Sequence, residues 1–332
     1  KGVQMSEDFP RMTYDEAMTR FGHDAPDLRF GMEIVDISDL AGAVDFQVFC
    51  KAVAAGNYVR GLNAVGAAEK YSRRKIDELT EYVKGNFGAK GLVWFKVDEN
   101  GQLASPSAKN FSPDQLASIA DRMSASPGDL LLFLADQWDV TCRGLYGIRK
   151  RFGTELNLFD PNEMHFSWIV EFPMFDWNEE GKCWNAMHHP FTAPRTEDLP
   201  TLGSNPSQAR AQAYDLVING FEAGGGTIRI HDSDTQSQVF SLLGLTDEIA
   251  RERFGFLLDA LSYGAPPHGG IALGIDRVVM LFAKLSNIRD CIAFPKTQKA
   301  TDLMTEAPGS VDTQQLEELR IQILESSPET DQ

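Results

Sequence analysis

The sequence contains few cysteines and no closely spaced cysteine pair. Its four cysteines lie far apart along a chain of 332 residues, so no C-x-x-C spacing indicates a zinc knuckle or a redox motif. Free thiols are therefore expected, as in a reduced cytoplasmic protein. No apolar run approaches the roughly 20 residues that a membrane helix requires, and the first residues lack the apolar core of a signal peptide. We therefore expect a cytoplasmic protein without a membrane segment.

Positive charge is also scarce. Lysine and arginine number 31 against 48 aspartates and glutamates, which gives a formal net charge of −17. This excess of negative charge argues against non-specific nucleic-acid binding, although a local basic patch could still hold such a partner. Hydrophobic residues at 42% and charged residues at 24% exclude a disordered or collagen-like chain. The length favours roughly two globular domains.

The common nucleotide-binding and hydrolase signatures are missing. The sequence has no G-x-x-x-x-G-K-[ST] phosphate loop and no G-x-G-x-x-G fingerprint, the two most familiar cradles for nucleotide phosphates. It also lacks the H-E-x-x-H and G-x-S-x-G patterns of metalloproteases and serine hydrolases. An enzyme of this sequence that uses ATP must therefore bind it with another architecture.

Three segments differ in composition and pattern. Residues 1–40 are interpreted as a connector, in which Thr13 and Glu16 form a capping box ahead of a short helix. Residues 41–155 have the helix and strand signals of a compact α/β unit, and residues 156–332 concentrate histidine, glycine and arginine. Helices are predicted after Ser72 and Ser112 and over 140–152, 235–243, 246–261 and 276–285, strands over 92–97, 129–134, 166–172 and 271–273, and a frayed polar tail from Ser326.

The strongest local signal lies in residues 270–282, where a period of two changes to a helical period at Gly274. Small residues in the strand let a ligand approach closely, and the start of the next helix offers free N–H groups to an anion. Arg277 adds a planar fork suited to phosphate oxygens. We favour a phosphate-binding strand–turn–helix. The alternative is a buried element in which Arg277 pairs with Asp276 or another acid.

A second cluster surrounds three consecutive glycines. A strand ending at Glu222, a turn at 224–226 and a return strand over 227–230 are predicted to form a hairpin. Asp215 and Glu222 could hold a hard cation through oxygen, and Arg229 could clamp a carboxylate. The two acids are seven residues apart, so they can serve one site only through a bulge, a twist or a water. A glycine hairpin with a surface Glu–Arg pair is equally compatible with the pattern.

Histidines and basic stretches give weaker signals. His188 and His189 are adjacent, so their side chains diverge; one could hydrogen-bond a ligand while the other packs. The remaining histidines, including His23 and His268, are interpreted as structural. Residues 140–154 contain four basic side chains and no acidic one. We interpret this segment as a solvated face, with a phosphate-backbone contact as the minor alternative.

Eight stretches of the sequence, taken together and in order, resemble the C-terminal part of bacterial-type aspartyl-tRNA synthetases. These enzymes belong to class II of the aminoacyl-tRNA synthetases. Any one stretch is weak evidence, but the resemblance extends over essentially the whole chain. The stretches are residues 9–14, 25–29, 187–192, 214–220, 224–230, 253–256, 263–268 and 303–308.

This resemblance implies an α+β fold: the C-terminal part of the antiparallel-sheet class II core, with residues 41–155 as an inserted α/β domain of the GAD type. Residues 1–40 and 156–332 would then belong to the catalytic core. Residues 270–282 are similar to motif 3 of class II, which implies that Arg277 binds ATP phosphates and that Gly274, Ile275 and Asp276 line the nucleotide.

The resemblance also implies roles for the other candidates. His188 would contact the aspartate substrate, and Arg229 would clamp its side-chain carboxylate. Asp215 and Glu222 would hold the Mg²⁺ that accompanies ATP, with Glu222 also counted among the ATP-binding residues. Arg277, Arg229 and His188 are the expected catalytic residues.

The implied activity is aspartate–tRNA ligation, with aspartate, ATP and tRNA(Asp) as partners, tRNA(Asn) left open, and a homodimer for the complete enzyme. The family's anticodon-binding domain and its motifs 1 and 2 have no counterpart here, and the sequence does not begin with methionine. We therefore expect part of an enzyme that is inactive alone. The alternatives are a non-catalytic tRNA- or partner-binding module and an asparaginyl-tRNA synthetase, the latter disfavoured by the GAD-like segment.

Overall fold

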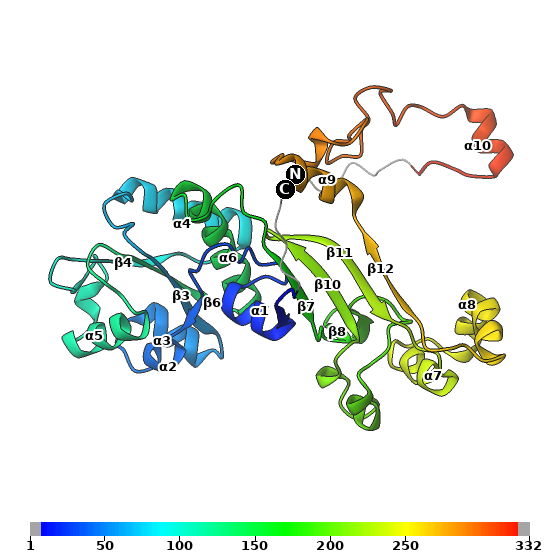
Figure 1. Cartoon of the computed structure of the whole chain (residues 1–332), viewed down its shortest axis with the longest axis horizontal. Helices are drawn as coiled ribbons and strands as arrows, with labels where there is room; N and C mark the ends of the chain where they lie inside the picture. The colour runs from blue at the N-terminus through cyan, green and yellow to red at the C-terminus, as the bar shows by residue number, and fades with distance from the viewer. Residues whose placement is uncertain (1–7, 325–332) are drawn as a thin grey trace. The chain divides into compact units, whose positions relative to one another are not determined.

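The computed structural model describes residues 8–324, and Figure 1 shows its course. The chain divides into two compact units, of which one extends to Arg277 and the other starts at Val278. The described part of the first unit contains two five-stranded sheets and a two-stranded ribbon. The polar tail predicted from Ser326 lies outside the described residues.

The first sheet has the strand order β1-β7-β10-β11-β12. The β1–β7 pair is parallel and the other neighbours are antiparallel. Strand β12 forms one edge, and all five of its residues are exposed. The sheet therefore joins residues near the start of the chain to residues more than 150 positions later. Its strands are β1 (Arg11–Thr13), β7 (Phe166–Val170), β10 (Ala213–Ile218), β11 (Phe221–Ile228) and β12 (Gly269–Leu273).

The second sheet is antiparallel with the order β2-β3-β6-β4-β5. Its central strand β6 is a run of apolar residues that alternate between two cores, Leu130, Leu132 and Leu134 on one face and Leu131 and Phe133 on the other. Because both faces are covered, the run has no polar alternation. The strands are β2 (Val35–Asp36), β3 (Tyr58–Ala64), β4 (Val93–Val97), β5 (Leu103–Ala104) and β6 (Leu130–Asp136).

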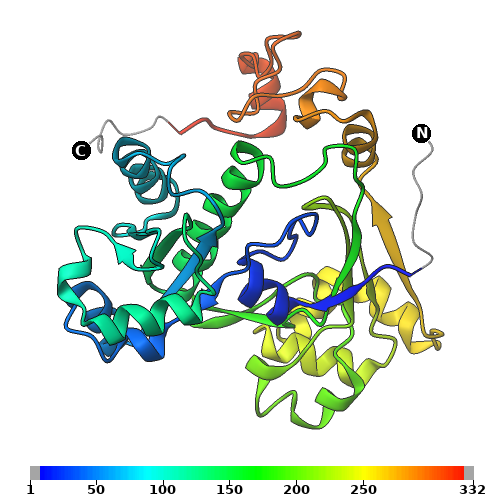
Figure 2. The same ribbon diagram turned by 60° about the vertical axis from the view of Figure 1, so that its left-hand side comes forward.

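Five helices flank this second sheet. Helices α4 and α6 contribute to the core on one face, and α2, α3 and α5 to the core on the other. Figures 1 and 2 show this layered arrangement. Since β2 already belongs to the sheet, the second sheet begins a few residues before position 41. The helices are α2 (Ser38–Ala41), α3 (Gln47–Ala54), α4 (Arg73–Phe87), α5 (Pro113–Arg122) and α6 (Trp138–Glu155).

The predicted helix starts are confirmed. The Thr13 hydroxyl accepts from the Glu16 N–H ahead of α1 (Tyr14–Phe21), although the Glu16 carboxylate accepts from Arg20 rather than reaching back. Ser72 caps α4 in the same way, and Ser112 and Gln115 form a complete capping box for α5. These starts are local features, which is why sequence alone locates them.

The hairpin prediction is wrong about the position of its turn. The turn lies at Asn219 and Gly220, both with positive φ (51° and 81°), and residues 224–226 lie inside strand β11. An Asn-Gly pair is the favoured two-residue turn because both positions accept positive φ. A Cβ at Gly220 would also lie 3.0 Å from the Asp27 Cβ. The three glycines therefore form part of the sheet surface.

The remaining elements surround the first sheet or belong to the second unit. Helix α1 packs against both β7 and α6, as Figure 2 shows. Among the described residues, no helix combines the length and apolar character needed to cross a bilayer. These elements are β8 (Phe175–Asn178), β9 (Cys183–Ala186), α7 (Ser233–Leu242), α8 (Asp247–Ser262), α9 (Ile275–Ala283), α10 (Thr313–Leu319) and the 3₁₀ turns Ala108–Asn110, Thr196–Thr201, Pro206–Gln208 and Ile288–Asp290.

Candidate functional site

A cavity of about 790 Å³ lies over strands β11 and β12 and the loop that precedes them in the chain. Four of the predicted site residues line it together: His188, Asp215, Glu222 and Arg229. The glycines of the two strands form much of its floor, because a residue without a side chain leaves the sheet surface open. The other lining residues are Asp24, Phe172, Met187, His189, Gly225, Gly226, Thr227, His268, Gly269, Gly270, Ile271 and Ala272.

The two carboxylates share one face of the sheet because of a β-bulge. Asp215 pairs with Gly225, but the register shifts between Leu216 and Val217, so that Ala223 is an extra residue on β11. A bulge reverses the alternation of side chains along a strand. A Cβ on Gly225 would lie 2.5 Å from Asp215 Oδ1 and 3.4 Å from Glu222 Oε1. Both carboxylates therefore lie directly above this glycine, and the space that they occupy excludes any larger residue there.

Burial and the neighbouring acids change the ionisation of Asp215. Burial, followed by the negative charges of Glu222 and Asp24, raises the pKa of Asp215 from 3.8 to about 7. Desolvation and nearby like charges both disfavour the ionised form. A raised carboxyl pKa in a cavity is typical of a site that binds a cation or handles protons.

Replacing Asp215 by asparagine is expected to stabilise the protein at high pH only. The pKa of Asp215 in the folded protein lies above its ordinary value, so the protonated side chain stabilises the folded state. This contribution is fully present below about pH 4 and is lost as the pH rises through about 7. Asparagine cannot ionise. The midpoint of thermal unfolding of Asp215→Asn should therefore lie roughly a few degrees above that of the wild type at pH 8. At pH 4 the two midpoints should be close to each other.

The measurement is thermal unfolding at both pH values. Asp121→Asn, the same change at an exposed position on α5, is the control and should show no such pH-dependent gain. An equal gain for Asp215→Asn at pH 4 and pH 8 would contradict the assignment of the pH effect to this carboxyl.

Arg229 follows strand β11 and is held there by its backbone. Its N–H donates to the His268 carbonyl at 2.9 Å, and the residue forms a β-bridge with Thr192. Its Nη1 atom is buried and has no hydrogen-bond partner among the described residues. A buried guanidinium nitrogen without an acceptor is costly. In a cavity, this arrangement is suited to an anionic ligand.

The histidines lie on the rim and wall of the same cavity. The surrounding protein desolvates His188 and lowers its pKa, although Asp24 and Glu222 partly oppose the shift. Burial and then the charge of Arg229 lower the pKa of His189. Both rings are therefore neutral near pH 7, and a neutral imidazole can donate or accept a hydrogen bond. His268, interpreted as structural from sequence, also lines the cavity.

Arg277 lies at a smaller cavity of about 310 Å³ that shares Asp24, Asp215 and Glu222 with the first. Its Nη1 donates to the Glu222 carbonyl at 2.8 Å and lies 3.3 Å from the Glu222 carboxylate. Gly274, Ile275 and Asp276 connect β12 to the first turn of α9 and line neither cavity. The structure thus brings Arg277 to the carboxylates but does not bring these three neighbours to a cavity wall.

Sequence reasoning missed Asp24, which lines both cavities. It lies in the segment interpreted as a connector, and nothing local distinguishes it, because it reaches the site through the packing of residues 18–32. A signal for it is present only in the adjoining stretch 25–29 of the family resemblance.

The described residues contain no group of three or more His, Cys, Asp or Glu side chains arranged to hold a metal ion. Asp215 and Glu222 form a pair of carboxylates with Asp24 nearby. Such a pair suits a hard cation that takes its remaining ligands from phosphate oxygens and water, as Mg²⁺ commonly does.

Comparisons with known proteins identify the family of the chain. A family model described as tRNA synthetases class II (D, K and N) matches residues 1–298. A curated relative from Rhodopirellula baltica, an aspartate–tRNA(Asp/Asn) ligase, is 63% identical over 320 residues, which cover 96% of this chain and 54% of the relative. The ligase of the same description from Anoxybacillus flavithermus is 52% identical over 97% of this chain and 54% of its own length.

The chain therefore spans about half the length of the curated relatives that it matches. Among solved structures, asparaginyl-tRNA synthetase from Pyrococcus horikoshii complexed with asparaginyl-adenylate matches 74% of this chain and 48% of its own, with 16% identity and a TM-score of 0.33.

Proposed function

Because the chain belongs to the class II tRNA synthetases of the D, K and N group, we propose that it forms part of an aspartate–tRNA ligase. The observation that carries this choice is the buried Nη1 of Arg229 in the cavity wall, which has no hydrogen-bond partner within residues 8–324. The letters D, K and N stand for aspartate, lysine and asparagine, and of these three amino acids only aspartate has a side chain that supplies a negative counter-charge to the guanidinium. A lysine would be repelled, and an asparagine would leave the guanidinium without a partner anion.

In this proposal, Arg229 clamps the side-chain carboxylate of aspartate and His188 contacts the same substrate from the opposite loop. A planar guanidinium can donate two parallel hydrogen bonds to a carboxylate, which fixes both position and orientation. The neutral His188 ring, with its lowered pKa, adds a hydrogen-bonding group without a charge that would compete with Arg229.

ATP would lie along β12 with its phosphates toward Arg277. Gly274, Ile275 and Asp276 line neither cavity but are exposed next to Arg277, and in this proposal they would line the part of the nucleotide that extends beyond the cavities. The fit of Mg²⁺ is supported by the donor set, because the carboxylates of Asp215 and Glu222 both lie above Gly225 and carboxylate oxygens are ligands that Mg²⁺ prefers. Mg²⁺ bound by these two residues would neutralise phosphate charge. Arg277 is already anchored to Glu222, so its fork can face a phosphate without a large rearrangement.

The proposed reaction has two steps. A carboxylate oxygen of aspartate attacks the α-phosphorus of ATP, the bond to the bridging oxygen breaks, and pyrophosphate leaves. A ribose hydroxyl at the 3′ end of tRNA(Asp) then attacks the aspartyl carbonyl, and AMP leaves. The protein contributes positioning and charge neutralisation. Whether tRNA(Asn) is also a substrate stays open in this proposal.

We further propose that the chain holds part of the site. Strand β12 ends its sheet with all residues exposed, including Ile271 and Leu273, and an exposed apolar edge strand is suited to pairing with another strand. Residues that relatives carry beyond the matched half would supply that strand, the anticodon-binding domain and the homodimer interface. The second sheet with its helices would be the GAD-type insertion, which we place at residues 41–155 with the few preceding residues that form β2. The catalytic core would then consist of residues 1–40 and 156–332 on either side of the insertion.

The proposal is tested by aspartate-dependent ATP–pyrophosphate exchange. The assay is run on this chain and on a form extended to the length of its relatives. We expect exchange by the extended form in the presence of Mg²⁺ and little or none by the chain alone. Exchange by the chain itself would overturn the proposal of an incomplete site. A folded extended form that exchanges with neither aspartate nor asparagine would instead favour a tRNA- or partner-binding module.

A further inference from the structure

Helix α6 uses two faces for two different purposes. Leu145, Ile148 and Phe152 pack into the core of the second sheet. Cys142, Tyr146, Arg149 and Gly153 follow one another at helical spacing and form a stripe on another face. We refer to these four residues as the α6 stripe. It contacts residues 18–32, the segment that carries Asp24 to the cavities.

The ends of the α6 stripe fit closely against this segment. A Cβ on Gly22 would lie 2.5 Å from the Cys142 carbonyl oxygen, and a Cβ on Gly153 would lie 2.8 Å from the Phe30 ring. Contacts this close leave no room for the segment to slide along the helix. The position of residues 22–30 is therefore fixed relative to α6.

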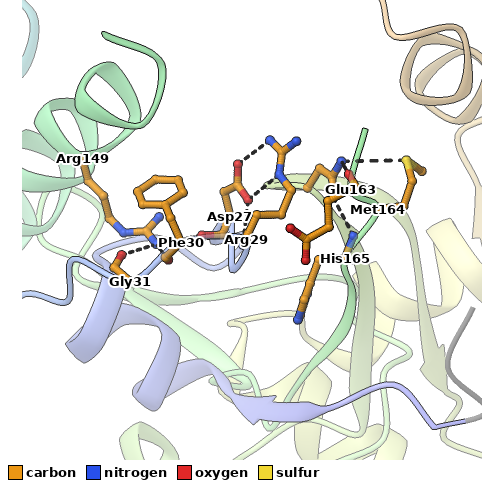
Figure 3. A network of polar contacts seen from close by, with 9 residues as sticks. Asp27, Arg29, Phe30, Gly31, Arg149, Glu163, Met164 and His165 are labelled. Carbon is orange, nitrogen blue, oxygen red and sulfur yellow. Dashed lines mark hydrogen bonds and ion pairs between the residues drawn. The ribbon is translucent and has the colours of Figure 1, made fainter. Parts of the chain in front are cut away.

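Arg149 holds the middle of the segment, as Figure 3 shows. Its side chain is fully buried, and its Nη2 donates to the carbonyls of Asp27, Phe30 and Gly31 at 2.7, 2.9 and 3.0 Å. Its Nε donates to Met32 O at 3.1 Å. The interpretation of segment 140–154 as a solvated face is therefore wrong for Arg149, because the free carbonyls of an irregular loop solvate its charge instead of water.

Tyr146 holds the part of the segment next to the cavities. Its ring stacks on His23 with centroids 4.2 Å apart and planes at 23°. His23 Nδ1 accepts from the Ala25 N–H at 2.8 Å and lies 3.2 Å from Asp24 Oδ1. Because Nδ1 accepts the Ala25 N–H, the ring that Tyr146 fixes holds the backbone on both sides of Asp24, and thereby the position of this residue.

We propose that Tyr146 and Arg149 are positioning residues, which keep the Asp24 carboxylate on the wall shared by the two cavities. The inference rests on the proposed function and adds to it: the module built on the second sheet takes part in shaping the substrate site through α6. Neither residue touches the substrate in this proposal. Both act by fixing residues 22–32.

The first test requires no substrate. Asp24 and His188 line the same cavity, and the charge of Asp24 opposes the lowering of the His188 pKa, so the His188 ring is used as the reporter. Its ring resonances are compared by NMR in this chain and in Asp24→Asn, Arg149→Met and Tyr146→Leu. If the α6 stripe positions Asp24, Arg149→Met and Tyr146→Leu shift these resonances in the same direction as Asp24→Asn. Tyr146→Phe keeps the stacking ring and should retain the wild-type signature. Arg143→Met, the same change on an exposed face of α6, is the matched control.

The second test is kinetic and uses the form extended to the length of its relatives. Displacing a substrate-site group by about 1 Å can cost on the order of a hundredfold in rate. We expect Tyr146→Leu and Arg149→Met to reduce kcat/KM for aspartate about 10- to 100-fold. Added to Asp24→Asn, either change should have little further effect, because coupled residues are non-additive.

The outcomes separate the two proposals. His188 shifts without any aspartate-dependent exchange would overturn the proposed function and leave the positioning role standing. Exchange that is unaffected by either variant, with unchanged His188 resonances, would overturn the positioning role alone. Should Arg149→Met fail to fold, because it leaves buried carbonyls unsatisfied, Tyr146→Leu decides the question by itself. Additive kinetic losses with Asp24→Asn would also contradict the inference.

Discussion

Replacing Arg229 by leucine is expected to reduce aspartate-dependent exchange by the extended form about a thousandfold. Removing one partner of a buried charge pair costs on the order of 3–5 kcal/mol, which corresponds to roughly this factor. The folded state should tolerate the change, because Nη1 has no protein partner to lose among the described residues. The measurement is kcat/KM for aspartate, together with thermal unfolding.

Two further variants make this prediction specific. Arg195→Leu removes an arginine whose partners Glu171 and Glu197 lie on the surface, and it should leave exchange nearly unchanged. Arg229→Lys keeps the charge without the planar fork, so it should fall between the wild type and the leucine variant. Unchanged aspartate kinetics in Arg229→Leu would remove this residue from the site and, with it, the argument for aspartate.

Replacing Arg277 by methionine is expected to reduce exchange by a factor on the order of a hundred to a thousand. One preorganised donor to a developing charge contributes about this much to kcat. The loss should appear both in kcat and in the KM for ATP. Stability should hardly change, since the ion pair with Glu222 is half-exposed on both sides and such pairs contribute little.

The matched control is Arg251→Met, which breaks an exposed ion pair with Asp259 and should leave exchange near the wild-type rate. A fall in the free energy of unfolding of Arg277→Met as large as its rise in activation free energy would contradict a phosphate-binding role. It would favour the alternative that the sequence left open, an arginine that serves mainly as the partner of an acid.

Local signals predicted much of the secondary structure. Thr13, Ser72 and Ser112 mark helix starts, and the apolar run at 130–134 marks a strand covered on both faces. These features depend on hydrogen bonds and side chains within a few residues, so the sequence contains them. The hairpin shows the limit: the three glycines suggested a turn, although the Asn219-Gly220 pair was the stronger signal.

The composition of the site could be predicted, but its geometry could not. His188, Asp215, Glu222 and Arg229 were identified as candidates, and they line one cavity. That Asp215 and Glu222 face the same side depends on a bulge at Ala223. A bulge is set by the register with a neighbouring strand rather than by local sequence.

The charged and hydrogen-bonding residues, the helix starts and the family resemblance can all be read from the residues alone, because these properties are local or lie in ordered motifs. The arrival of Asp24 at the cavities and the burial of Arg149 come from packing between distant segments. Both depend on contacts between segments more than 100 residues apart. The physical reason is that the burial of a charge is a property of the surrounding packing, which no local pattern of residues contains.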